Sequence, residues 1–199
     1  AISAVGALEL RSGGLDNRDK GRIGSDTGIT LHGAQLYNGE QGRITSRGKI
    51  EATLSGLDQR DGGYLFSATG ISLDLQGGTL INRDKGVIAS PGQLLLRQIG
   101  ALDNSAGGEI SSDLGYSLHT DRLDNQGGRL ISADSLILRI ANALDNSRNG
   151  VLSAGAGLDI EAGSLSNTHG GTLASRGDIG LTLEGLLANQ HQGPLSAGG

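Results

Sequence analysis

One short phrase recurs along the whole chain and restricts the folds that are open to it. A Leu is followed two residues later by Asn or, once, by Gln, and successive phrases begin 21, 21, 23, 22, 21, 21, 21 and 22 residues apart. The amide residues of the phrase are Asn17, Asn38, Gln59, Asn82, Asn104, Asn125, Asn146, Asn167 and Asn189. A period of roughly 20 to 50 residues is typical of solenoids and repeat arrays. We therefore interpret residues 1–199 as a single repeat array, with partial units at 1–14 and 187–199.

Each unit continues in the same way after its amide. A glycine follows three or four residues later, Ile or Leu stands two positions beyond that glycine, and Ser or Ala stands two positions further on. Apolar and polar residues alternate with a period of two, which is typical of β-strands. Glycines interrupt these runs so often that no helix of about 10 residues fits. We expect short strands, with the glycines at tight bends or at positive φ.

The length and order of the unit exclude other repetitive folds. Glycine makes up 36 of the 199 residues, but it does not occupy every third position as a collagen triple helix requires. Leucine-rich repeats need L-x-x-L-x-L-x-x-N, and a left-handed hexapeptide helix needs a period of about six. Neither pattern is present. The sequence predicts a right-handed parallel β-helix of about nine coils, with two or three strands in each coil.

In a parallel β-helix, equivalent residues of consecutive coils lie on top of one another at ~4.8 Å. An inward-facing amide without a partner would cost several kcal/mol, so we predict that the nine amides bond from coil to coil as a structural ladder. Nine coils give a length on the order of 43 Å. Neither end shows a polar or helical cap, and we expect the array to be continuous with further coils of a longer filament at both ends.

Charge and composition argue against several classes of partner. The net charge is −5, with acidic and basic residues mixed along the chain and no basic block, so we expect no nucleic-acid partner. Cysteine is absent, which excludes disulfides and thiolate metal sites, and it also suits a chain that crosses a pore unfolded. No apolar run approaches the ~18 residues of a membrane span, so we expect no membrane insertion. We predict no cofactor.

Coil stacking turns the loop after each amide into columns of charged side chains. Acids stand two positions after the first four amides, at Asp19, Glu40, Asp61 and Asp84. Two interpretations are open: a solvated network of ion pairs, or a stripe that binds a divalent cation or another ligand. The flanking Arg and Lys residues favour the ion pairs. We predict no metal site.

A second acidic column lies between the Leu and the amide and should point outward. Its members are Asp16, Asp58, Asp103, Asp124 and Asp145. Paired carboxylates on a β-helix could indicate a polysaccharide-cleaving enzyme. Because these acids recur as part of the unit, a turn role is favoured, in which each carboxylate accepts a hydrogen bond from a nearby backbone N–H. We predict no catalytic residues and no enzymatic activity.

Two further groups of residues have both a structural and a functional interpretation. His169 and His191 occupy the same position in neighbouring coils and could share a metal ion, but no further ligand is evident, so we interpret them and the other two histidines as surface residues. The tripeptide Arg176, Gly177 and Asp178 is a candidate adhesion motif. Its glycine coincides with a turn glycine of the unit, so the turn explains it without a receptor.

The unit L-[DSY]-N-x3-G-x-[IL]-x-[SA]-x2-3-G-x-[IL] resembles the haemagglutinin repeat of filamentous-haemagglutinin-type exoproteins, which include the CdiA proteins of contact-dependent growth inhibition. The resemblance covers essentially residues 1–199 in nine successive units. It implies a right-handed β-helix filament, export by two-partner secretion through an outer-membrane transporter, and a secreted or surface location on a Gram-negative bacterium. The secretion domain and the toxin domain of such proteins are not matched here, so their activities are not carried over.

These expectations lead to one function and two alternatives. We expect a rigid stalk segment that presents adhesive, receptor-binding or toxin regions of a large exoprotein. The first alternative is a directly adhesive segment that binds a glycan or a protein receptor on a host or neighbouring cell. The second is a β-helix enzyme that acts on carbohydrate.

Overall fold

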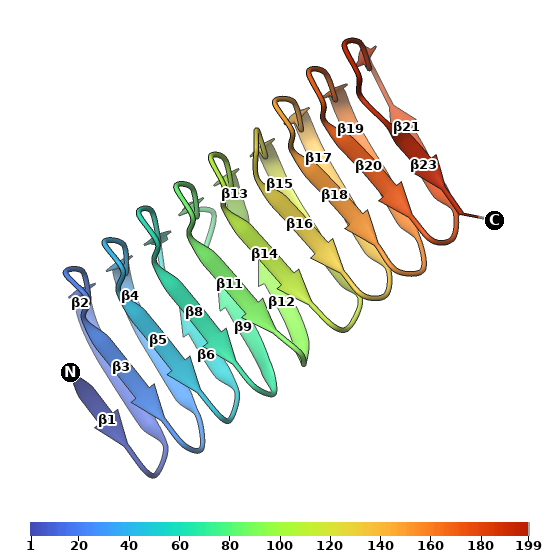
Figure 1. Ribbon diagram of the computed structural model, residues 1–199. Helices are drawn as coiled ribbons and strands as arrows, with labels where there is room; N and C mark the ends of the chain where they lie inside the picture. Colours follow the sequence, from blue (N-terminus) through green and yellow to red (C-terminus); the bar gives the residue numbers. More distant parts are fainter. Residues whose placement is uncertain (199) are drawn as a thin grey trace.

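The computed structural model describes residues 1–198, and the regular secondary structure within that range is entirely β. The chain winds as a right-handed parallel β-solenoid of about nine turns, ~21 residues apart, which confirms the predicted fold. The coils lie side by side from the N-terminus to the C-terminus, so the described molecule is a rod (Figure 1). Residues 1–198 contain no helix with the length and apolar character needed to span a membrane.

One sheet takes a single strand from each coil, directly after the loop that follows the amide. Its ten strands are parallel and are ordered as in the sequence. They are β1 (Ile2–Ala4), β3 (Arg22–Ser25), β5 (Arg43–Ser46), β8 (Tyr64–Ser67), β11 (Val87–Ser90), β14 (Glu109–Ser112), β16 (Arg129–Ser132), β18 (Val151–Ala154), β20 (Thr172–Ser175) and β23 (Leu195–Ala197). The register pairs apolar residues that point inward, so Ile23 lies opposite Ile44, which in turn lies opposite Leu65.

The second sheet forms the rest of each coil and leads up to the amide. It has thirteen parallel strands. They are β2 (Leu8–Asp16), β4 (Ile29–Tyr37), β6 (Ile50–Thr53), β7 (Gly56–Asp58), β9 (Gly70–Asp74), β10 (Thr79–Ile81), β12 (Gln93–Arg97), β13 (Ile99–Asp103), β15 (Tyr116–Asp124), β17 (Leu136–Asp145), β19 (Leu158–Ser166), β21 (Ile179–Leu183) and β22 (Leu187–Ala188). Because β4 pairs with both β6 and β7, one long strand in some coils corresponds to two shorter strands in others. The coils therefore contain two or three strands, as predicted.

The uneven spacing of the repeat is absorbed at the corner between these shorter strands. The longest interval includes Gln76 and Gly77, which have φ values of 53° and 87° and lie between β9 and β10. In the next coil Gln98, with a φ of 49°, separates β12 from β13. These residues bulge out at the corner, and the paired strands keep their register, with Leu80 opposite both Leu57 and Leu102.

The core is a thin apolar interior enclosed by the two sheets. Ile44, Leu80, Ile88 and Leu152 are 0% exposed. Burial of each such side chain stabilises the fold by about 1.5–3 kcal/mol. Tyr116 also points into this interior, where its hydroxyl donates to the backbone carbonyl of Ile110 at 3.1 Å and burial raises its pKa.

Candidate functional site

The structure places the nine predicted amides in one continuous file along a corner of the solenoid, where the first eight are buried and Asn189 is exposed. The side-chain NH₂ of each amide donates to the side-chain oxygen of the next, beginning with Asn17 to Asn38 at 2.7 Å and ending with Asn167 to Asn189 at 2.8 Å. The six bonds between them measure 2.6, 3.3, 2.8, 2.7, 2.7 and 2.8 Å. The longest of them runs from Gln59 to Asn82. We call this file the amide ladder.

Five ladder amides also donate to a backbone carbonyl of their own loop and to one of the following coil: Asn17, Asn82, Asn104, Asn125 and Asn146. Asn38 and Gln59 donate to a backbone carbonyl of the following coil. Asn104 donates to Asn125 Oδ1 at 2.7 Å, to the carbonyl of Gly108 in its own loop at 3.2 Å, and to the carbonyl of Arg129 in the following coil at 3.2 Å. Asn104 is 0% exposed. A buried side chain of this kind must have partners, so the ladder closes the loop within a coil and joins it to the next coil.

The loop after each amide contains a backbone conformation that the sequence did not predict. Non-glycine residues in this loop have positive φ, for example Asp19 at 51°, Lys20 at 61°, Arg148 at 53° and Asn149 at 65°. The left-handed region costs an L-residue about 1–2 kcal/mol. Backbone bonds between stacked loops offset this cost, such as Lys20 N–H to the Glu40 carbonyl at 3.0 Å.

The glycine that ends this loop lies at a tight bend, the second of the two settings expected for the recurring glycines, and it is required there for close approach. Gly21 does not have positive φ. A Cβ added there would lie 2.5 Å from both the backbone oxygen and Oδ1 of Asn17. At Gly108 the added Cβ would lie 2.7 Å from the same two atoms of Asn104. Asparagine and glycine therefore recur together because the ladder amide occupies the space that a side chain would need.

The acidic column beside the ladder has the turn role that the sequence predicts. Asp16, Asp58, Asp103, Asp124 and Asp145 each accept a hydrogen bond through Oδ1 from the backbone N–H two residues on, at 3.0–3.1 Å. This bond takes the place of a hydrogen bond from water at the backbone N–H of the first loop residue. The prediction is confirmed for all five residues.

Arginines of the loops in the first coils form ion pairs with this acidic column. Arg18 lies 2.6 Å from Asp16 and 4.0 Å from Glu40 of the next coil, and Arg60 lies 2.8 Å from Asp58. Hydrogen bonding to Arg18 lowers the pKa of Asp16 to about 2. Of the four loop acids, Glu40 and Asp84 take part in ion pairs, with Arg18 and Arg83. The predicted network therefore forms in part, and its members are individually weak.

Further along the rod, three carboxylates of the acidic column stack in consecutive coils, and of these Asp103 lies 3.7 Å from the guanidinium of Arg83. Asp103 lies opposite Asp124, and Asp124 lies opposite Asp145. The pKa of Asp124 is raised first by desolvation, and the charges of Asp103 and Asp145 add to that shift. An acid with a raised folded pKa disfavours the native state once pH rises above its unfolded pKa of about 3.9.

We predict that Asp124→Asn stabilises the rod at neutral pH. The amide oxygen can still accept from Gln126 N–H, and the like-charge contact with its neighbours is removed. The half-exposed position limits the gain in the free energy of unfolding to a few tenths of a kcal/mol. Urea unfolding at pH 7 and pH 3 checks this, because the gain should vanish where both states are protonated. The matched variant Asp16→Asn breaks the contact with Arg18 and should give no gain at pH 7; equal gains in both variants would contradict this explanation.

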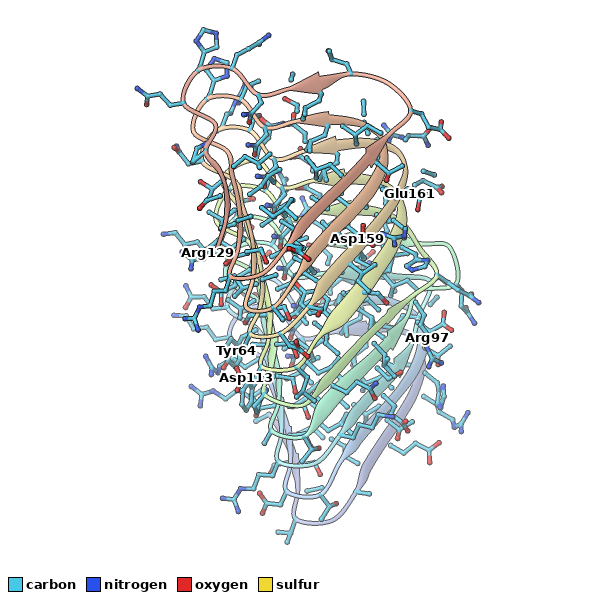
Figure 2. The ribbon with its side chains drawn as sticks, turned by 90° about the vertical axis from the view of Figure 1, so that its right-hand side faces the viewer. Tyr64, Arg97, Asp113, Arg129, Asp159 and Glu161 are labelled. Carbon is cyan, nitrogen blue, oxygen red and sulfur yellow. The ribbon has the colours of Figure 1, made fainter. Side chains whose placement is uncertain are left out.

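The outer faces of the two sheets carry different chemistry. Asp159, Glu161 and Arg97 lie on one side of the coil stack, and Arg129, Tyr64 and Asp113 lie on the other (Figure 2). On the first side, a shallow hollow of ≈ 380 Å³ is lined in part by Arg139 and Glu161. The guanidinium of Arg139 bonds to Asp159 at 2.6 Å and lies 3.1 Å from Glu161, so its charge is neutralised within the rod.

The opposite side has shallow hollows over the ten-stranded sheet. One of them measures ≈ 460 Å³ and is lined mainly by small residues together with Phe66. The ring centroids of Phe66 and Tyr64 lie 6.1 Å apart, and the guanidinium of Arg43 lies 4.2 Å from the centre of the Tyr64 ring. The sequence did not predict this cluster, although alternation along β5 and β8 places all three side chains outward.

The remaining predicted residues lie on the surface. Arg176 and Asp178 are exposed at the corner between β20 and β21, and a Cβ on Gly177 would collide with the carbonyl of Ala156, so the turn requires this glycine. His169 and His191 stack on each other with ring centroids 4.8 Å apart. Within residues 1–198, no group of three or more His, Asp or Glu side chains is arranged to bind a metal ion.

The described residues form a right-handed parallel β-solenoid with an internal amide ladder. The sequence model of the haemagglutinin repeat matches this chain at residues 1–53, 55–111, 92–148 and 138–199, and the chain belongs to the haemagglutinin repeat family. Proteins with this repeat are generally secreted or surface-exposed adhesins, and the family is structural rather than enzymatic. Comparison with curated proteins and with solved structures gives no significant match.

Proposed function

We propose that this segment is a rigid stalk of a large secreted or surface-displayed bacterial exoprotein and presents adhesive, receptor-binding or toxin regions to another cell. The observation that supports this most strongly is the unbroken amide ladder from Asn17 to Asn189. The hydrogen bonds between neighbouring strands and between stacked loops join one coil to the next, as the bonds of the ladder do. Bending the rod would strain all of these bonds together. The rod should therefore be stiff, as a stalk that holds two regions of a protein apart must be.

The proposal extends to export and location. We propose export by two-partner secretion through an outer-membrane transporter of a Gram-negative bacterium, with the transporter contacting regions other than residues 1–199. The absence of cysteine supports this, because no disulfide could obstruct an unfolded chain in a pore. Nearest-neighbour contacts also support it, since each emerging coil can pair with the coil before it.

Removal of one whole coil tests the stalk role. Deletion of residues 102–122 from the full exoprotein removes one period and joins Ala101 to Leu123 in register. We expect a folded filament that is shorter by one coil spacing, about 4.8 Å, and that still presents its other regions. Deletion of half a coil, residues 102–111, breaks the register and should abolish folding of the neighbouring coils. Thermal unfolding and a cell-contact assay measure the two effects.

Binding by the isolated segment would indicate the adhesive alternative. The 199-residue chain is applied to cells and to immobilised glycans. A stalk should show no saturable binding, and saturable binding that is lost on substitution of outward-facing residues would contradict a purely mechanical role. Turnover of a polysaccharide by the same preparation would contradict the proposal in favour of an enzyme.

A further inference from the structure

The last two loops bring a pair of imidazoles together through their backbones. His169 and His191 have φ values of 53° and 54°, so their Cα–Cβ bonds leave equivalent backbones in the same direction. The loops are joined by bonds from His169 N–H to the Gln190 carbonyl at 3.2 Å and from Gly170 N–H to the His191 carbonyl at 3.1 Å. The rings stack at 25° with centroids 4.8 Å apart, and both side chains are exposed. The solenoid itself therefore sets the spacing of the pair.

A neighbouring hydroxyl orients one of the rings. His169 Nδ1 lies 2.9 Å from Thr168 Oγ1. When Nδ1–H donates to this oxygen, the lone pair of the neutral imidazole is on Nε2. Metal-binding histidines use the same arrangement, in which the second ring nitrogen donates to a neighbouring acceptor and the first one binds the metal.

The surroundings of the pair offer space and oxygen donors. A shallow hollow of ≈ 330 Å³ is lined by His169, Gly170, His191 and the amide residues Asn149 and Gln192. Amide oxygens and water are acceptable further ligands for a divalent ion. Arg148 occupies the same loop position one coil earlier, so the histidine column has two members in this segment.

We propose that His169 and His191 form a two-histidine site for a divalent transition metal ion of the Cu²⁺ and Zn²⁺ class. In the H-E-x-x-H motif, zinc is bound by histidines at positions i and i+4 of a helix, whose Cβ atoms are about 5–6 Å apart. Stacked coils present the two imidazoles at a comparable spacing of ~4.8 Å. In the stacked arrangement the in-plane lone pairs of the two rings run nearly parallel, so binding of one ion requires these exposed side chains to rotate out of the stack. Two protein ligands leave the other coordination positions to water, to the nearby amide oxygens, or to a donor from another molecule. Imidazole ligands favour Cu²⁺ over Zn²⁺ in affinity.

Calorimetric titration of the untagged 199-residue chain with CuCl₂ and with ZnCl₂ tests the site. The chain has four histidines and no cysteine, so two of its four imidazoles belong to the proposed site. We expect one ion per chain, and His169→Asn or His191→Asn should each weaken binding by about 100-fold, because the second ligand is no longer tethered beside the first. Asparagine tolerates the left-handed backbone, so both variants should keep the native melting temperature.

The control is His119→Gln, which removes an exposed histidine on β15 and should leave the affinity unchanged. Electron paramagnetic resonance of the Cu²⁺ complex should show coupling to two imidazole nitrogens in the native chain and to one in each asparagine variant. Absence of binding by the native chain would overturn the site. So would binding that survives His169→Asn, or that is lost equally in His119→Gln. None of these results would affect the proposed stalk role.

Discussion

Replacement of Asn104 by alanine is expected to lower the free energy of unfolding by about 3 kcal/mol. The side chain is fully buried and donates to Asn125, to Gly108 and to Arg129. Its own oxygen accepts from Asn82 at 2.8 Å. Alanine can make none of these bonds, so buried polar groups on three successive coils lose a partner. Urea unfolding followed by circular dichroism measures the loss.

The control for this prediction is Asn142→Ala, an exposed asparagine of the same solenoid that lies outside the ladder. We expect its effect to remain within about 0.5 kcal/mol, as for most surface substitutions. If Asn104→Ala destabilises the chain no more than Asn142→Ala does, the ladder does not stabilise the fold in the way we propose.

The second large effect is expected for Gly108→Ala, which should destabilise the rod by about 3 kcal/mol. The new methyl group would lie 2.7 Å from both the backbone oxygen and Oδ1 of Asn104, and closer still to the carbonyl of Asn82. These atoms are backbone and ladder groups that cannot move without breaking their own hydrogen bonds. For a chain of this size the melting temperature should fall by roughly 10 °C, which calorimetry can measure.

Gly24→Ala is the matched control for this glycine. It lies on the outer face of β3, and an added Cβ would meet its first neighbours, two oxygens of Thr45, at 3.8 Å. We expect a change within about 0.5 kcal/mol. A similar loss of stability in both variants would show that backbone freedom, and not contact with the ladder, is the reason for the recurring glycine.

The features that repeat in every coil could be predicted from the sequence. A parallel solenoid places each residue against its own counterpart, so the period of Leu15 and Asn17 defines both the register and the inward-facing amides. The same logic assigned Asp16 and its equivalents to turns, because a residue that recurs in the repeat unit is expected to have a structural role in each coil. The membership of the ladder depends on this periodicity alone.

Features that depend on one local contact could not be predicted in this way. Positive φ at Asp19 and Lys20 arises because bonds between stacked loops offset an unfavourable conformation, and a single coil read alone carries no sign of it. Glycine is required at position 21 because the backbone oxygen and Oδ1 of Asn17 occupy the space that a Cβ would need. The contact of His169 with Thr168 depends on side-chain rotamers, which leave no period in the sequence.

The central claim is that equivalent residues of consecutive coils lie directly opposite one another, and disulfide trapping tests it most directly. Thr30 of β4 pairs with Glu51 of β6, and Glu51 pairs with Ser72 of β9. The chain contains no native cysteine. Strands ~4.8 Å apart allow a disulfide, whereas residues two coils apart, at about 10 Å, exceed its reach. We predict an intramolecular disulfide in Thr30→Cys with Glu51→Cys and none in Thr30→Cys with Ser72→Cys. Failure of the first pair to form, or equal formation of both, would contradict the stacked register.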